Sequence, residues 1–244
     1  MSVALTEREI RVGGRPVRHR VTGEGPPLVL VHGLGGSTRW WEPVLPALAE
    51  RHAVHLVDLP GFGAMARRGR RIALAETGAW LLAWLDAAGI ARPALVGHSM
   101  GAAIAVRAAA ARADRLDRLV LVAPAGLLAR SLLGYGLPLA AALRRAPPRL
   151  VSILVRDAVR AGPLTLLRST LEVVADDARA DLRRVTVPTL VVAGERDPIV
   201  PAAVCDVVRE ELPAARLVVL PRAGHVPMFD RPEAFAETLL EFLG

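Results

Sequence analysis

Several residue types are scarce in this 244-residue chain, and their scarcity excludes whole classes of protein. The single cysteine, Cys205, cannot form an internal disulfide and cannot build a Cys/His metal cluster. No run approaches the roughly 18 apolar residues that a membrane-spanning helix needs. The first twenty residues are charged throughout and lack the apolar core of a signal peptide. We therefore expect a cytoplasmic protein with no metal and no stable membrane insertion.

Lysine, asparagine and glutamine are absent, so all 31 positively charged side chains are arginine. Against 24 acidic residues this gives a net charge of +7, which could attract nucleic acid. The arginines are spread along the chain, however, and no RNA-binding or zinc-finger signature accompanies them. Apolar residues make up 52% of the chain and charged residues 23%, which indicates a folded protein. We expect no nucleic-acid partner, and the sequence leaves the oligomeric state open.

Alternating and continuous apolar patterns predict the secondary structure. Residues 7–12 and 15–22 alternate around Gly13-Gly14, which is typical of a hairpin. The runs that follow are short and almost wholly apolar, which is typical of strands covered on both faces; they span 28–32, 53–59, 94–98, 119–123, 189–194 and 216–221. Helical patterns alternate with them at 40–51, 73–89, 100–112, 201–212 and 231–243. This order predicts an α/β protein with a parallel sheet.

One segment interrupts the alternation of strands and helices. Residues 126–184 hold no strand-like run, are rich in leucine, and carry ten arginines against five acidic residues. We expect a helical cap inserted over the sheet, which divides the chain into a first core part (1–125), the cap (126–184) and a second core part (185–244). The alternative is an ordinary pair of surface helices.

The segment Gly97-His98-Ser99-Met100-Gly101 lies between an apolar run and an alanine-rich helical pattern. A serine on so sharp a strand–helix turn projects its hydroxyl away from the sheet, and the flanking glycines avoid collisions with neighbouring backbone. The helix amino end also directs the N–H of Met100 toward negative charge near the serine. We therefore predict that Ser99 is a nucleophile.

A serine nucleophile needs a base, and the base needs an orienting group. Asp197 and His225 each follow an apolar run, so both are expected at the carboxyl edge of the sheet with Ser99. We predict His225 as the base and Asp197 as the acid, with Glu195 as a weaker substitute.

Asp58 is expected to fix a turn. Of the other histidines, His32 is expected to brace the loop after the first apolar run, and His98 to pack or form a hydrogen bond; the rest, His19, His52 and His55, are expected to be structural or exposed.

Five motifs in this order resemble the α/β-hydrolase superfamily over essentially the whole chain. They are His32-Gly33-Leu34-Gly35-Gly36, Asp58-Leu59-Pro60-Gly61-Phe62-Gly63, Gly97-His98-Ser99-Met100-Gly101, Gly194-Glu195-Arg196-Asp197 and Gly224-His225-Val226-Pro227. The resemblance implies an α/β-hydrolase fold: a mostly parallel eight-stranded sheet flanked by helices, with a helical cap. It also implies that the N–H of Leu34 is the second oxyanion donor beside that of Met100.

The chain departs from the family pattern at Ala64, where serine is frequent, and at Asp230, where glutamate is frequent. Serine at position 99 is unlike epoxide hydrolases and haloalkane dehalogenases, which carry aspartate there.

The resemblance implies a serine hydrolase acting on a small-molecule acyl substrate without a metal or organic cofactor. A carboxylesterase is the expected activity. Thioesterases, lactonases, acyltransferases and carbon–carbon bond hydrolases use the same catalytic triad and are alternatives. A noncatalytic binding protein is the remaining alternative. Candidate pocket residues are apolar: Trp40, Trp41, Leu127, Met228 and Phe229, with Leu128, Leu132, Leu133, Leu137 and Leu139 from the expected cap. For most of these leucines core packing is the competing interpretation, and a cap arginine could instead bind a substrate carboxylate.

Overall fold

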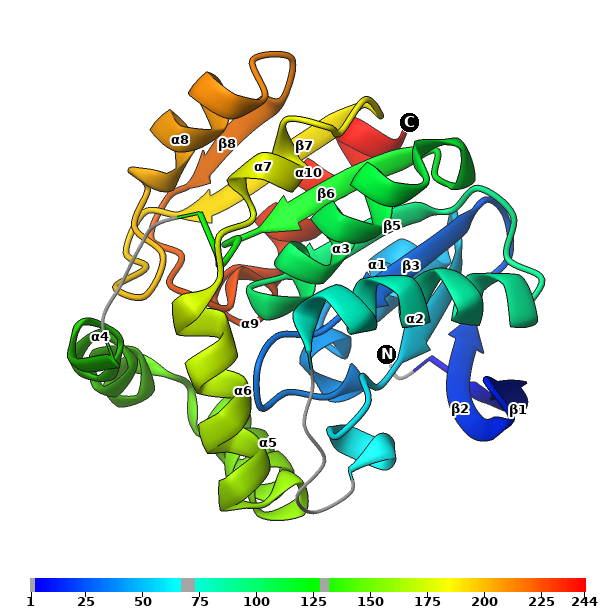
Figure 1. Ribbon diagram of the computed structural model, residues 1–244, viewed down its shortest axis with the longest axis horizontal. Helices are drawn as coiled ribbons and strands as arrows, with labels where there is room; N and C mark the ends of the chain where they lie inside the picture. The colour runs from blue at the N-terminus through cyan, green and yellow to red at the C-terminus, as the bar shows by residue number, and fades with distance from the viewer. Residues whose placement is uncertain (1–2, 67–72, 128–131) are drawn as a thin grey trace.

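The computed structural model describes residues 3–66, 73–127 and 132–244. Their strands form one sheet of eight in the order β1-β2-β4-β3-β5-β6-β7-β8 (Figure 1). The strands are β1 (Thr6–Val12), β2 (Arg15–Thr22), β3 (Pro27–Val31), β4 (Ala53–Val57), β5 (Ala94–His98), β6 (Arg118–Val122), β7 (Thr189–Gly194) and β8 (Arg216–Leu220). β1 pairs antiparallel with β2, and β2 with β4, whereas β4, β3, β5, β6, β7 and β8 are parallel. The predicted mostly parallel sheet is therefore confirmed.

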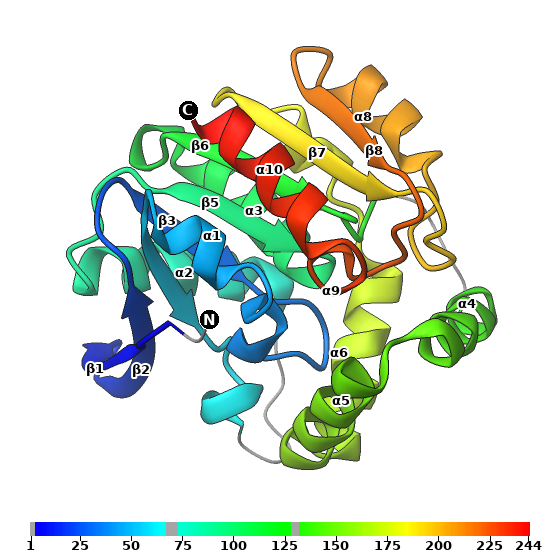
Figure 2. The ribbon, with the colours of Figure 1, turned by 180° about the vertical axis from the view of Figure 1, so that it is seen from behind.

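Helices cover both faces of the sheet. On one face lie α2 (Leu74–Ala87), α3 (Met100–Ala111) and α8 (Val204–Glu211), and on the other α1 (Leu45–Ala49) and α10 (Pro232–Leu243) (Figures 1 and 2). Alternate residues of each strand enter different cores: Val29 and Val31 of β3 pack under α2 and α3, whereas Leu28 and Leu30 pack under α1 and α10. Both sides of the strand are buried, which explains why its sequence is continuously apolar.

The segment at 40–51 differs from the single helix that its pattern predicts. It forms a short 3₁₀ turn, η1 (Thr38–Trp41), followed by α1. Pro43 and Pro46 explain the break, because proline donates no backbone hydrogen bond and is accommodated only in the first turn of a helix. Pro46 stands at that position in α1.

A helical insertion occupies the interval between β6 and β7. Within its described part are α4 (Leu132–Arg145), α5 (Pro148–Ala161), α6 (Pro163–Ala175) and the short α7 (Arg179–Leu182). α4, α5 and α6 lie beyond the carboxyl ends of the parallel strands (Figures 1 and 2). Two further short elements, η2 (Gly63–Met65) and η3 (Ala113–Arg115), follow β4 and α3, and α9 (Pro227–Asp230) precedes α10. None of the described helices is long and apolar enough to span a bilayer.

Candidate active site

Ser99 occupies the sharp turn that joins β5 to α3. Its backbone has φ 53° and ψ −116°, a strained conformation for a residue with a side chain. The turn is possible because two glycines allow backbone segments to approach closely. A Cβ on Gly97 would lie 2.4 Å from the carbonyl oxygen of Gly101, and a Cβ on Gly101 would lie 2.5 Å from that of His32. The serine hydroxyl is thereby presented at the carboxyl edge of the sheet.

A continuous chain of hydrogen bonds joins Ser99, His225 and Asp197. The distance from His225 Nε2 to Ser99 Oγ is 3.2 Å, and that from His225 Nδ1 to Asp197 Oδ2 is 2.8 Å. Asp197 follows β7 and His225 follows β8, so the parallel sheet brings the three residues together across 126 positions. The second carboxylate oxygen of Asp197 accepts hydrogen bonds from the backbone N–H groups of Ile199 (2.8 Å) and Val200 (2.9 Å). These two bonds fix the orientation of the carboxylate toward His225.

Hydrogen bonds hold the peptide that joins Gly33 to Leu34. His32 Nδ1–H donates to the carbonyl oxygen of Gly33 at 2.8 Å, while the N–H of Leu59 donates to His32 Nε2 at 3.0 Å. Because His32 Nε2 accepts an N–H, it carries no proton and the ring is neutral with its proton on Nδ1; burial also lowers the pKa of His32. The Gly36 N–H also donates to the Gly33 carbonyl, at 3.1 Å. A trans peptide places its N–H opposite its carbonyl, so fixing the Gly33 oxygen fixes the direction of the Leu34 N–H.

Met100 supplies a second backbone N–H near Ser99. It is the first residue of α3, where helical N–H groups have no partner within the helix. Among the described residues, no acceptor is bonded to the N–H of Met100 or of Leu34. Met100 directly follows Ser99 in sequence, and Leu34 lines the same cavity as Ser99. The two donors therefore remain available to an oxygen that develops negative charge.

His98 and Asp230 hold the segment that carries His225. His98 Nε2–H donates to the backbone carbonyl of His225 at 2.7 Å, and burial lowers the pKa of His98 well below its usual value, so this ring is neutral. Asp230 accepts a hydrogen bond from the N–H of Gly224 at 2.8 Å, and burial raises the pKa of its carboxyl. From the sequence, His98 was expected only to pack or to form a hydrogen bond. Its position before the serine is the signal that could have indicated contact with the histidine segment.

The remaining candidate acids and histidines lie elsewhere. Asp58 accepts hydrogen bonds from the backbone N–H groups of Thr38 and Ala64, both at 2.7 Å. It thereby fixes a turn, as expected. The exposed Glu195 accepts from the N–H of Arg222 and has no bond to His225. The histidines outside the site, His19, His52 and His55, are buried in or beside β2 and β4.

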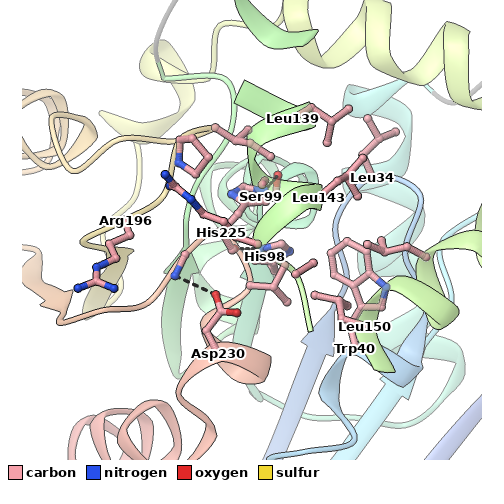
Figure 3. Close-up of a pocket in the computed structure, with 18 residues that line it drawn as sticks. Leu34, Trp40, His98, Ser99, Leu139, Leu143, Leu150, Arg196, His225 and Asp230 are labelled. Carbon is pink, nitrogen blue, oxygen red and sulfur yellow. Dashed lines mark hydrogen bonds between the residues drawn. The ribbon is translucent and has the colours of Figure 1, made fainter. Parts of the chain in front are cut away.

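A cavity opens above Ser99 and His225, between the sheet and the insertion (Figure 3). Most of its lining is apolar and comes from α4, α5 and the loops after the strands: Leu34, Trp40, Leu139, Leu143, Leu150, Leu154, Ile199 and Val226. Arg145 and Arg196 also line it, and both are exposed. In Figure 3 the guanidinium of Arg196 points away from Ser99. The lining of the site is thus mostly apolar, and it includes Ser99 and His225.

Trp40 and Leu139 line this cavity as expected, but four other candidates do not. Trp41 and Met228 are fully buried in the core under α1 and α10, and Phe229 packs against that core. Leu127 is buried in the core on the opposite face of the sheet. The expectation for these four residues is corrected, because their side chains pack in or against the two cores that cover the sheet. Leu137 is 71% exposed and lines no part of the cavity, Leu128 lies outside the described residues, and the side chains of Leu132 and Leu133 are not described.

A mostly parallel sheet that carries a serine at a strained strand–helix turn, with an acid and a histidine after later strands, defines the class of α/β serine hydrolases. The chain belongs to the alpha/beta hydrolase family, whose model matches residues 28–238. It is 32% identical to a pimeloyl-[acyl-carrier protein] methyl ester esterase of Aeromonas hydrophila, over 91% of this chain and 97% of that protein.

Solved structures agree with this assignment. The fold matches a serine hydrolase involved in carbazole degradation with a TM-score of 0.86 and 25% identity, covering 98% of this chain and 99% of that one. It matches the enol-lactonase from Burkholderia xenovorans LB400 with a TM-score of 0.83 and 26% identity, covering 97% and 99% of the two chains. The chain is an enzyme of the hydrolase class within this family.

Proposed function

We propose that this enzyme hydrolyses a carboxylic ester through an acyl-enzyme intermediate on Ser99. The observation that carries the proposal is the hydrogen-bonded chain from Ser99 Oγ to His225 (3.2 Å) and on to Asp197 (2.8 Å). A free serine hydroxyl is a weak nucleophile, and an adjacent oriented imidazole is what activates it. In this role Ser99 is the nucleophile, His225 the general base and Asp197 the group that orients the imidazole.

The proposed reaction has two halves. In the first, Ser99 Oγ attacks the ester carbonyl carbon while its proton passes to His225 Nε2, and the carbonyl oxygen becomes an oxyanion. The backbone N–H groups of Leu34 and Met100 donate to that oxyanion. His225 then gives its proton to the departing alcohol, which leaves the acyl group on Ser99. In the second half, His225 takes a proton from water, the hydroxide attacks the acyl carbon, and the acid departs as Ser99 regains its proton.

The cavity supports a neutral acyl chain as the substrate. Leucines from α4 and α5 line the cavity, and transfer of each methylene from water to such a lining contributes about 0.8 kcal/mol. The exposed Arg145 and Arg196 remain solvated, where a contact with a charged group contributes about 0–1 kcal/mol. We therefore assign the segment 126–184 the role of a cap that shapes an apolar acyl site and limits the access of water. The proposed partner is a small neutral ester.

A fluorophosphonate probe and a short p-nitrophenyl ester test the proposal. We expect the probe to label Ser99 alone and to block hydrolysis of the ester. Ser99→Ala should lose both labelling and hydrolysis while its thermal unfolding curve stays close to that of the parent. The matched control is Ser152→Ala on the exposed side of α5, which should keep both. Labelling of folded Ser99→Ala at the parent rate would refute the assignment.

A further inference from the structure

One carboxylate of the insertion is buried against the core domain. Asp157 lies on α5 and is 1% exposed. It shares a face of the helix with Leu150, Ile153 and Ala161, at spacings of three and four residues. A carboxylate on an apolar helical face is costly to bury unless it is paired, so its partners indicate its role.

Both partners of Asp157 belong to the segment that follows Leu34. The hydroxyl of Ser37 donates to Asp157 Oδ2 at 2.6 Å, and Arg39 Nη1 lies 3.5 Å from Asp157 Oδ1. Ser37 is itself 1% exposed and is the N-cap of η1, where its oxygen accepts from the N–H of Arg39. Burial raises the pKa of Asp157, and the hydrogen bond from Ser37 and the charge of Arg39 oppose that rise.

The loop 33–37 is therefore held at both ends. At its beginning, His32 and the Gly36 N–H bind the carbonyl of Gly33. At its end, Ser37 is bound to Asp157 across 120 positions of sequence. Leu34 lies between the two attachment points; it lines the cavity, and its N–H has no acceptor among the described residues. Movement of Ser37 would be transmitted to this peptide over only three residues.

From this geometry we infer that Asp157 is a positioning residue for the oxyanion donor: through Ser37 it fixes the Leu34 N–H, and so makes the insertion part of the catalytic apparatus. This inference rests on the proposed function, because it assigns a role within the same ester hydrolysis. Asp157 does not touch the substrate. Loss of one oxyanion donor lowers kcat about 10²–10³-fold, so a donor that is displaced and not removed should lower it by roughly tenfold to a hundredfold.

The test compares two of the polar contacts that join α5 to the segment around η1: the buried Ser37–Asp157 hydrogen bond and an exposed ion pair. Asp157→Ala and Ser37→Ala each break the buried contact, whereas Arg149→Ala breaks the exposed ion pair between Arg149 and Glu42 (3.0 Å) and serves as the control. We expect the first two variants to lose roughly tenfold to a hundredfold in kcat on a p-nitrophenyl ester with KM changed less than about twofold. The control should keep the parent kcat. Asp157→Asn retains an oxygen that can accept from Ser37, and we expect it to recover most of kcat.

A double variant and a binding measurement separate positioning from mere stabilisation. Because Ser37 and Asp157 act through one contact, the variant that lacks both should be no slower than the worse single variant. Affinity for a trifluoromethyl ketone, whose adduct with Ser99 carries an oxyanion, should fall in parallel with kcat. If Ser37→Ala folds with the parent kcat, the inference is wrong although the proposed function stands. Failure of the parent enzyme to hydrolyse p-nitrophenyl esters of any acyl length would refute the proposed function itself.

Discussion

Replacement of Asp197 by asparagine gives the sharpest test of the proposed mechanism, because the structure determines how the amide would sit. Asp197 Oδ1 accepts two backbone N–H groups, from Ile199 and Val200, so the amide oxygen must occupy that position. The amide NH₂ then takes the place of Oδ2 and faces His225 Nδ1. An NH₂ group can only donate, so Nδ1 must accept and the ring proton moves to Nε2. Nε2–H cannot take a proton from Ser99.

The expected loss follows from this change of tautomer. In a Ser-His-Asp triad the corresponding substitution lowers turnover by about 10⁴-fold, or about 5.4 kcal/mol of transition-state stabilisation. We expect a similar fall in kcat for Asp197→Asn, measured with a p-nitrophenyl ester. The fold should be retained because the two backbone hydrogen bonds are kept. The control is Glu195→Gln, two residues away on the same loop, whose exposed side chain accepts a hydrogen bond from the N–H of Arg222; it should keep parent activity.

The reasoning fails if folded Asp197→Asn loses less than about tenfold. Such a result would mean that another carboxylate orients His225. The nearest alternative in sequence is Glu195, and its glutamine variant would then show the large loss instead.

Two further predictions concern substrate choice and acid stability. Neutral medium-chain esters should be preferred to esters with a distal carboxylate, with kcat/KM almost independent of NaCl concentration, because the cavity arginines are solvated; a tenfold preference for the carboxylate ester that disappears in Arg145→Ala would contradict this. Burial, aided by the neighbouring charges of His19 and Arg8, lowers the pKa of His55 to about 4 in the folded protein. The unfolded chain binds this proton near pH 6.5, so the contribution of neutral His55 to stability is complete above pH 6.5 and is lost as the pH falls toward 4. Urea unfolding of His55→Gln should therefore show a weaker loss of stability over that interval, and an unchanged pH slope would count against the prediction.

The sheet and the central residues of the site could be predicted because each depends on local sequence. A strand buried on both faces must be apolar at every position, as in 28–31, and such runs are easy to recognise. The turn at Ser99 can also be recognised from the sequence, since only glycine fits at positions 97 and 101. Parallel strands end at one edge, so residues that follow them are brought together whatever their separation in sequence. That rule alone places Ser99 near Asp197 and His225.

The cavity lining depends on information that no local pattern contains. Trp40 and Trp41 are adjacent and chemically identical, and both are buried in the core under α1 and α10, yet only Trp40 of the two also lines the cavity. Which of them faces the site is decided by the direction of the short turn η1, and that turn is held by tertiary contacts, the Thr38–Asp58 hydrogen bond and the Ser37–Asp157 hydrogen bond.

The burial of Asp157 is even harder to predict from the sequence than the lining of the cavity. In the sequence it is one of five acidic residues in a segment with ten arginines, and nothing distinguishes it from a solvated surface charge. Its burial follows only from the way α5 crosses η1, which places a carboxylate of the insertion on a serine of the core 120 positions away. A contact of this kind has no periodicity and no motif. It is nevertheless the contact through which the insertion can affect the chemistry at Ser99, because it terminates the loop that carries the Leu34 N–H. Substitutions within the insertion should therefore fall into two groups: those that alter the apolar lining change KM and the choice of ester, whereas those that disturb Asp157 change kcat.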